Sequence, residues 1–348
     1  MKICLLVLWG DSLTYTIAKA LAFNDHQVQV WVTDTERHKR AVWGLPQRIA
    51  AIPGVSVVAG DTVEPPEQFD QLIVQGHRLL LGYRHVLDRL APRTIRITAI
   101  SSGDRSRPYR QAFKLQWSEL CWYGRWSRKV KRVAYKDGYY PVDLFGSFKL
   151  RQVVGFDAHS KFLQDEALFR AIHAQDWKSD SSRPIRANFL GSRDPASRGQ
   201  ILDSIDAYFI HPSPGDKQQK HMVWHVYSDA RPAALSPVEF LETLVNSDFT
   251  LSPPGYSLVT HRPVEALLRG SIPVINADEL DLYDLGLVDG VNCIAVSSGG
   301  WPAAMDRITH MDEGEIVAMR RNILTMLTDR VTYPALSRNI CRRLGLDV

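Results

Sequence analysis

The amino-terminal part of the chain alternates between continuous apolar runs and segments with helical spacing. Residues 3–9 form an apolar run of strand length, which is typical of a strand buried on both faces of a parallel sheet. Residues 14–23 carry apolar side chains at helical spacing, and residues 28–32 form a second apolar run. A strand, a helix and a strand within so short a stretch predict a right-handed βαβ crossover.

The same alternation continues to about residue 100 and restarts after residue 180. Apolar runs predict further strands at residues 55–58, 71–74, 94–100, 186–190, 221–226, 249–252 and 272–275. Helical patterns occur at residues 83–90, 157–177, 199–210, 238–247, 261–269, 313–328 and 334–344. Alternating strands and helices indicate the α/β class with doubly wound parallel sheets. The linker-like stretch 178–184 predicts one Rossmann-like domain over residues 1–178 and a second over residues 179–333, followed by a helix within 334–348.

Composition and charge narrow the classes of protein. The chain has 348 residues, of which 45% are hydrophobic and 23% charged, so disordered, collagen-like and coiled-coil classes are disfavoured. Lys and Arg number 42 against 38 Asp and Glu, which gives a formal net charge of +4. So small an excess does not call for nucleic acid as a partner, and we expect none.

The spacing of the cysteines and the length of the apolar runs indicate the cellular compartment in which the protein is expected. The cysteines at 4, 121, 293 and 341 lie far apart, with no CxxC pair, which argues against a disulfide scaffold or a structural zinc site. The first apolar run is too short for a signal-peptide core, and no run reaches the length of a transmembrane helix. We therefore expect a cytoplasmic protein, with peripheral contact at the inner face of a membrane as a further hypothesis.

Ligands of doubly wound domains bind at the carboxyl ends of the strands, so the loops after strands hold the candidate chemistry. The first such loop contains Asp11 and only one glycine, which disfavours the three-glycine fingerprint of a nicotinamide or flavin site. Asp11 is a candidate general base, and the alternative is a cap of the following helix. His77 follows a later strand and could accept a proton near neutral pH, although a lone histidine is often structural.

The segment 251–275 carries the most information. A strand ends in Pro253, Pro254 and Gly255, whose small loop lets the backbone approach a ligand closely. The N-terminus of the next helix suits a diphosphate, and Arg262 could add a charge-assisted bond to it. Glu265, about one turn further, could accept bonds from ribose hydroxyls. The alternative is a plain strand–helix–strand unit with Glu265 in a surface ion pair.

Residues 249–296 resemble the C-terminal, donor-binding region of exostosin-like glycosyltransferases. The resemblance rests on a strand, a Pro/Gly loop, an arginine shortly before Glu-Ala-Leu, and a small-residue turn before Ile-Pro-Val. The counterparts here are Pro253, Gly255, Arg262, residues 265–267, Gly270 and residues 272–275. Residues 189–193, which contain Gly191 and Arg193, resemble the strand and glycine loop that open the nucleotide-sugar domain of that family. The N-terminal half resembles the GT-B class only in pattern.

The resemblance implies a GT-B glycosyltransferase with two Rossmann-like domains facing a central cleft. It places a nucleotide-sugar donor on the C-terminal domain, a glycan or lipid-linked glycan acceptor on the N-terminal domain, and the last helix against the N-terminal domain. The donor-binding residues it implies are Gly191, Arg193, Pro254, Gly255, Tyr256, Ser257, His261, Arg262 and Glu265.

The resemblance also implies an inverting reaction that needs no cofactor and no bound metal, because a helix dipole and basic side chains neutralise the leaving group. Inversion requires one base, for which Asp11 and His77 are the candidates, followed by Asp104. The alternative is a retaining reaction, which would depend on donor-side groups and which no residue here excludes. The nearest approaches to a DxD metal motif lie at residues 34–36 and 279–281, where a turn or a helix start explains the acids equally well.

A basic and aromatic segment runs from Trp122 to Lys136 and contains no acidic residue. One hypothesis is a surface for a membrane or a polyanionic glycan, and another is nucleic-acid binding. The third is an amphipathic helix or hairpin with a solvated basic face.

For the whole chain, the alternatives to a transferase are a nucleotide-sugar epimerase or hydrolase on the same fold and a non-catalytic carbohydrate-binding protein.

Overall fold

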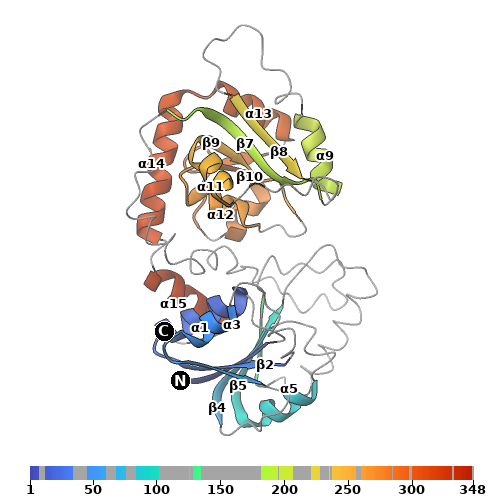
Figure 1. Cartoon of the computed structure of the whole chain (residues 1–348), viewed down its shortest axis with the longest axis vertical. Coiled ribbons are helices and arrows are strands. Elements are labelled where there is room, and N and C mark those ends of the chain that lie inside the picture. The colour runs from blue at the N-terminus through green and yellow to red at the C-terminus, as the bar shows by residue number, and fades with distance from the viewer. Residues whose placement is uncertain are drawn as a thin grey trace. The chain divides into compact units, whose positions relative to one another are not determined.

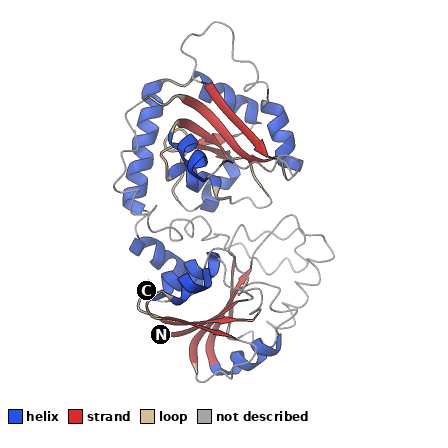
Figure 2. Ribbon diagram, viewed as in Figure 1, coloured by secondary structure: helices blue, strands red, loops and turns tan. Residues whose placement is uncertain are grey.

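The computed structural model describes most of the chain and divides it into two units. The described residues are 1–7, 12–33, 45–59, 68–75, 84–101, 125, 128–134, 182–194, 196–206, 221–227, 235, 237–255, 260–283, 285–297, 300–330 and 333–346. One unit contains Met1–Glu166 and Thr332–Val348, and the other contains Ala167–Val331. Each unit is built around its own parallel sheet (Figures 1 and 2).

The first unit holds a six-stranded parallel sheet. Its strands are β1 (Lys2–Val7), β2 (Gln27–Val32), β3 (Val55–Ala59), β4 (Phe69–Gln75), β5 (Thr94–Ser101) and β6 (Val130–Ala134). Their order is β3-β2-β1-β4-β5-β6, and every neighbouring pair is parallel. Because the order reverses between β1 and β4, the carboxyl ends of these two strands mark the usual position of a ligand in such a sheet.

Helices cover both faces of this sheet. Helix α1 (Ser12–Phe23) packs against β1 and β2 and lies beside α3 (Leu45–Ala50) and α15 (Tyr333–Leu344) (Figure 1). Helix α5 (Arg84–Leu90), continued by a short 3-10 turn at Ala91–Arg93, covers the other face. There Val86, Leu87 and Leu90 join a buried cluster with Trp31 and Leu72 of the sheet.

The last helix, α15, is an integral part of the first unit. The carbonyl oxygen of Leu344 accepts hydrogen bonds from Gln71 Nε2 at 3.0 Å and from Thr98 Oγ1 at 2.8 Å. The buried thiol of Cys341 lies 3.6 Å from the carbonyl oxygen of Ala20 in α1. The chain therefore returns to its first sheet after completing the second unit.

The second unit holds a five-stranded parallel sheet in the order β11-β10-β9-β7-β8. Its strands are β7 (Ile185–Ser192), β8 (His221–Tyr227), β9 (Ser247–Leu251), β10 (Ile272–Asn276) and β11 (Ile294–Val296). The helices are α9 (Ala196–Ile205), α11 (Pro237–Val245), α12 (Arg262–Leu267), α13 (Gly300–His310) and α14 (Glu313–Arg330), with a 3-10 helix at Ala277–Tyr283. The chain passes from β7 to β8 on one side and later to β9 on the other, so the order reverses between β7 and β9.

A buried charge cluster fixes the amino ends of this sheet. The Arg183 guanidinium donates to the carbonyl oxygens of Ser247 at 2.8 Å and Arg269 at 3.2 Å. Burial and the charge of Arg320 together lower the pKa of Arg183 to about 9, although the charge of Asp248 opposes the change. The buried Asp248 carboxylate pairs with Arg320 and lies 3.5 Å from Arg186. The cluster lies at the opposite end of the strands from the ligand-binding edge, so its role is to hold the scaffold.

The predicted α/β class with two doubly wound units is confirmed, and several elements differ in detail. Helix α9 begins at Ala196 rather than at residue 199, and α12 ends at Leu267 rather than at residue 269. The elements α3, β6, β11 and α13 were not predicted. Residues 130–134, part of the segment interpreted as a helix, hairpin or surface patch, pair with β5 as the sixth strand of the first sheet. The predicted helix at 157–177 lies outside the described residues.

Candidate functional site

The reversal of strand order in the second sheet brings two loops side by side. Asn188 of β7 pairs with Thr250 of β9 in parallel register, so the two strands deliver their carboxyl ends to the same place. The loop after β7 begins beyond Ser192, and the loop after β9 runs through Ser252 to Gly255. In an open α/β sheet this is the position at which ligands bind.

Arg262, the first residue of α12, lies against the end of β7. Its Nε donates to the carbonyl oxygen of Leu190 at 3.1 Å, and its Cζ lies 4.7 Å from the centroid of the Phe189 ring. The Phe189 ring in turn contacts Trp224 of β8, with 5.3 Å between ring centroids. The arginine is thus held by a carbonyl and by cation–π stacking, and its charge lies at the carboxyl edge of the sheet.

Gly191 provides the space that Arg262 occupies. A β-carbon built on Gly191 would stand 3.2 Å from Arg262 Cζ and closer still to Nη2. Any larger residue at this position would therefore displace the guanidinium. Both residues were predicted to bind the donor, and the structure brings them into contact.

Arg198 of α9 makes the reciprocal contact: it extends from the helix after β7 to the loop after β9. Its Nε donates to the carbonyl oxygen of Pro254 at 3.1 Å, and its Nη1 donates to that of Ser192 at 3.3 Å. A β-carbon on Gly255 would stand 2.5 Å from its Nη2. The side chain is 8% exposed. Sequence reasoning missed this residue, although its signal was present: Arg198 shares the apolar face of α9 with Leu202 and Ile205 at helical spacing.

The other described candidates for donor binding lie around these two arginines. Arg193 is exposed, and its guanidinium pairs with Asp203 along α9. His261 stands at the N-cap position of α12 with helical backbone angles, φ −75° and ψ −25°. Glu265 lies in the first turn of α12 and is partly buried. Tyr256 and Ser257 lie outside the described residues, as do the candidate bases Asp11, His77 and Asp104.

The segment that follows the loop after β9 is held by the 3-10 helix Ala277–Tyr283. The backbone N–H of Thr260 donates to the hydroxyl of Tyr283 at 3.0 Å, and Tyr283 is fully buried. Glu279, one of the acids considered as a metal ligand, is buried and accepts a bond from Asn276 Nδ2 at 2.8 Å, whereas Asp281 is exposed. Within the described ranges, no three His, Cys, Asp or Glu side chains converge as a metal site.

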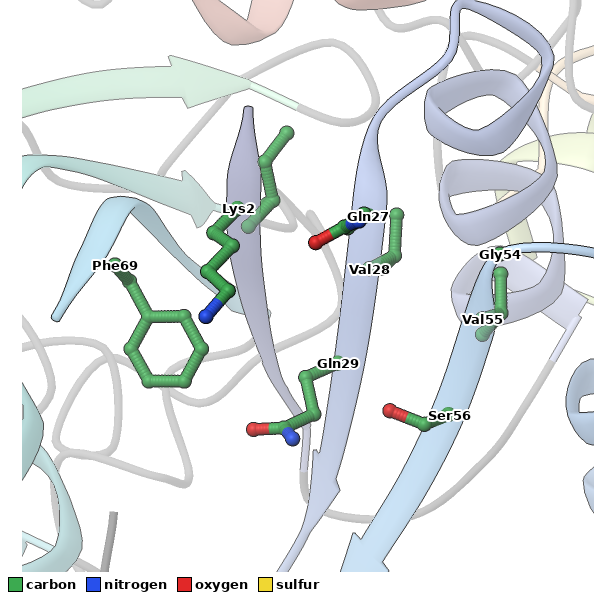
Figure 3. Close-up of a pocket in the computed structure, with 9 residues that line it drawn as sticks. Lys2, Gln27, Val28, Gln29, Gly54, Val55, Ser56 and Phe69 are labelled. Carbon is green, nitrogen blue, oxygen red and sulfur yellow. The ribbon is translucent and has the colours of Figure 1, made fainter. Parts of the chain in front are cut away.

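A groove of about 370 Å³ with both polar and apolar lining lies on the first unit (Figure 3). The side chains of Lys2, Gln27, Gln29 and Ser56 line it, together with Phe69. These residues come from the amino-terminal halves of β1, β2 and β3 and from the start of β4. Since ligands of doubly wound sheets bind at the carboxyl ends, we assign this groove no part in catalysis.

Two cations of the basic and aromatic segment make contacts within the first unit. Lys129 Nζ donates to the carbonyl oxygens of Thr94 at 2.8 Å and Ala91 at 3.3 Å. Arg125 lies 3.6 Å from the carboxylate of Asp88. These contacts tie the segment to the end of α5.

Of the helices in the described part of the chain, none combines the length and apolar character needed to cross a bilayer.

Comparison with known proteins identifies relatives of the second unit and of the whole fold. Residues 167–282 match the family model described as the RXYLT1 C-terminal domain. HepE of Anabaena, solved in complex with UDP, is 15% identical with a TM-score of 0.53, over 99% of this chain and 100% of that one. Sucrose-phosphate synthase from Thermosynechococcus elongatus is 11% identical with a TM-score of 0.50, over 98% of each chain. No curated protein sequence matches.

Two doubly wound parallel sheets and these structural neighbours define the fold as GT-B. The family model on residues 167–282 of the second unit, together with this fold, supports a glycosyltransferase that is similar to the exostosin-like enzymes. The GT-B fold expected from the resemblance in residues 249–296 is therefore confirmed, and the family model supports the expected kind of enzyme.

Proposed function

We propose that this enzyme transfers a sugar from a UDP-sugar to a glycan or lipid-linked glycan acceptor, with inversion and without a bound metal ion. The observation that carries the donor site is the position of Arg262. Leu190, Phe189 and the missing side chain of Gly191 hold its guanidinium at the carboxyl end of β7. The choice of uridine rests on HepE, which was solved with UDP and shares the fold.

Arg262 explains how the donor's diphosphate is bound and released. A guanidinium is always charged near neutral pH and presents a rigid fork of donors that matches phosphate oxygens. Its attachment to the sheet leaves little reorganisation to be done as negative charge develops on the leaving diphosphate. Glu265, in the first turn of the same helix, is positioned in sequence to accept bonds from the ribose hydroxyls.

The transfer is a single displacement. A base takes the proton of an acceptor hydroxyl, the oxygen attacks the anomeric carbon, and the bond from that carbon to the diphosphate oxygen breaks. The nucleoside diphosphate leaves with both electrons of that bond. Asp11, His77 and Asp104 follow β1, β4 and β5 in the sequence, and these strands are neighbours in the first sheet. All three remain candidates for the base.

The place of action remains a prediction. We infer a cytoplasmic enzyme that contacts the inner face of a membrane through residues between Trp122 and Lys136. What supports this is the sequence of that segment, which is basic and aromatic and lacks acids. Binding of the purified protein to vesicles with and without anionic lipid tests it, and equal binding to both would contradict it.

Release of UDP tests the proposed reaction. The enzyme is incubated in EDTA with a panel of UDP-sugars, with and without a panel of nitrophenyl glycosides as acceptors. We expect UDP release that depends on an acceptor, and a product whose anomeric configuration, read by proton NMR, is opposite to that of the donor. Release without any acceptor would favour a hydrolase or epimerase. Dependence on added Mg²⁺ or Mn²⁺ would contradict the metal-independent mechanism.

A further inference from the structure

In the proposed donor site, each of two neighbouring βα units places an arginine side chain against the other unit. Arg262, from the helix after β9, reaches the end of β7 beside Gly191. Arg198, from the helix after β7, reaches the loop after β9 beside Gly255. Each arginine thus occupies space that a glycine of the other unit leaves open. The sequence predicted a ligand role for Arg262 and for both glycines, and nothing assigns a role to Arg198.

The contacts of Arg198 join the loop after β7 and the loop after β9 beyond the last residues that pair the two strands. The last residues that pair β7 with β9 are Asn188 and Thr250, so beyond this point the two strands are not paired with each other. Beyond that point Arg198 donates to Ser192 in one loop and to Pro254 in the other. Burying a guanidinium is costly unless its donors are satisfied. Both carbonyls must therefore stay in place to keep this charge buried.

We propose that Arg198 is a positioning residue for the nucleoside diphosphate of the donor. By bridging the two carbonyls it fixes the spacing between the loop after β7 and the loop after β9. This inference rests on the proposed function, because it assumes that these loops contact the donor. Arg198 itself acts through Ser192 and Pro254 and needs no contact with the diphosphate.

The geometry requires an arginine at this position. The two acceptors belong to different loops, and the rigid fork of a guanidinium reaches both with Nε and Nη1 at once. A lysine ammonium is a compact group on a flexible stem, so it would satisfy one carbonyl and leave the other without its donor. A lysine at 198 would preserve the charge and lose the bridge.

The test compares UDP binding in Arg198→Met and Arg198→Lys with that in wild type and in Arg307→Met. Arg307 pairs with Asp289 on the surface of the same unit, so its variant controls for the loss of an arginine. We expect UDP to bind roughly 10-fold more weakly to both Arg198 variants, about the value of one charge-assisted hydrogen bond that the displaced loops no longer make. Hydrogen exchange of the backbone amides in residues 191–194 and of Ser252 and Gly255 should become faster in both. The control should match wild type in both measurements.

Gly255→Ala should also remove the Arg198 bridge. The added methyl group would displace the end of the Arg198 side chain, so this variant should bind UDP about as weakly as Arg198→Met. The double variant should be no weaker than either single one, because both changes remove the same bridge. If the two losses multiply, Gly255 acts independently and the bridge is not what places the loops.

Other outcomes separate this proposal from the proposed function. If wild type binds UDP and Arg198→Met binds it equally well, the positioning role is wrong while the donor site stands. Faster exchange with unchanged UDP affinity would also overturn the role and leave Arg198 as a structural contact. If wild type binds no UDP, the proposed donor itself is wrong, and the proposal falls with it.

Discussion

Gly191 lies directly against the guanidinium of Arg262, although 71 positions separate them in the sequence (262 − 191). A β-carbon at position 191 would stand 3.2 Å from Arg262 Cζ. The contact explains why a glycine stands at the end of a buried strand, where a side chain would otherwise add packing. The glycine makes room for a charge at the proposed donor site.

Gly191→Ala should therefore weaken donor binding. The methyl group would push the guanidinium away from Leu190, and we expect the Kd for UDP to rise about 10-fold, roughly the value of one charge-assisted hydrogen bond. Titration calorimetry measures the Kd. Gly199→Ala is the matched control, because a β-carbon there meets only the carbonyl oxygen of Arg193 at 3.5 Å. Equal affinities for the two variants would contradict the role of the Gly191 contact.

Glu265→Ala should weaken donor binding with little effect on stability. The carboxylate lies in the first turn of α12 and is only partly buried, so its removal leaves the buried side chains of Val264, Ala266 and Leu267 in place. We expect a Kd for UDP about 10-fold higher than that of wild type. A lower melting temperature together with unchanged affinity would instead assign Glu265 to the fold.

Asp248→Asn should destabilise the second unit strongly. Asp248 is fully buried between Arg320 and Arg186, and removing one partner of a buried ion pair costs about 3–5 kcal/mol. Urea unfolding followed by circular dichroism measures the loss. Asp289→Asn breaks the exposed pair with Arg307 and should cost less than about 1 kcal/mol. Comparable losses in the two variants would mean that burial does not govern the Asp248 pair.

Three described cysteines should be unreactive in the folded protein. Burial raises the pKa of Cys293 and of Cys341 from 9.0 to about 12, and raises that of Cys4 well above its usual value. The thiolate is the reactive form, so a raised pKa keeps these thiols protonated and inert at pH 8. In a Cys121→Ser background, Ellman's reagent should modify no thiol in the native protein and three in urea. Rapid reaction of the native protein would contradict the described burial.

The sequence predicted most of the scaffold because its central strands are continuous apolar runs. Strand β1 is such a run, and β10 likewise carries Ile272, Val274 and Ile275. Strand β6 was missed because Lys131 and Arg132 interrupt its short apolar pattern at the edge of the sheet. Strand β11, with three residues, is too short to show a period.

The candidate site was predictable where it follows local pattern and not where it depends on contacts between distant residues. Arg262 and Gly191 were singled out from the segments in which they lie. Their contact and the bridge made by Arg198 depend on the pairing of β7 with β9, which no local spacing reveals. Arg198 was overlooked because an arginine is rarely buried. Its partners are backbone carbonyl groups, which a pattern of side chains cannot identify.

The central claim is that Arg262 at the end of β7 binds the diphosphate of a nucleotide-sugar donor without a metal ion. The most direct measurement is calorimetric titration of UDP, in EDTA, into wild type, Arg262→Met and Arg307→Met. We expect metal-independent binding to wild type and Arg307→Met, and a Kd at least about 10-fold higher for Arg262→Met. Equal affinity of all three proteins, or binding that requires a divalent ion, would contradict the claim.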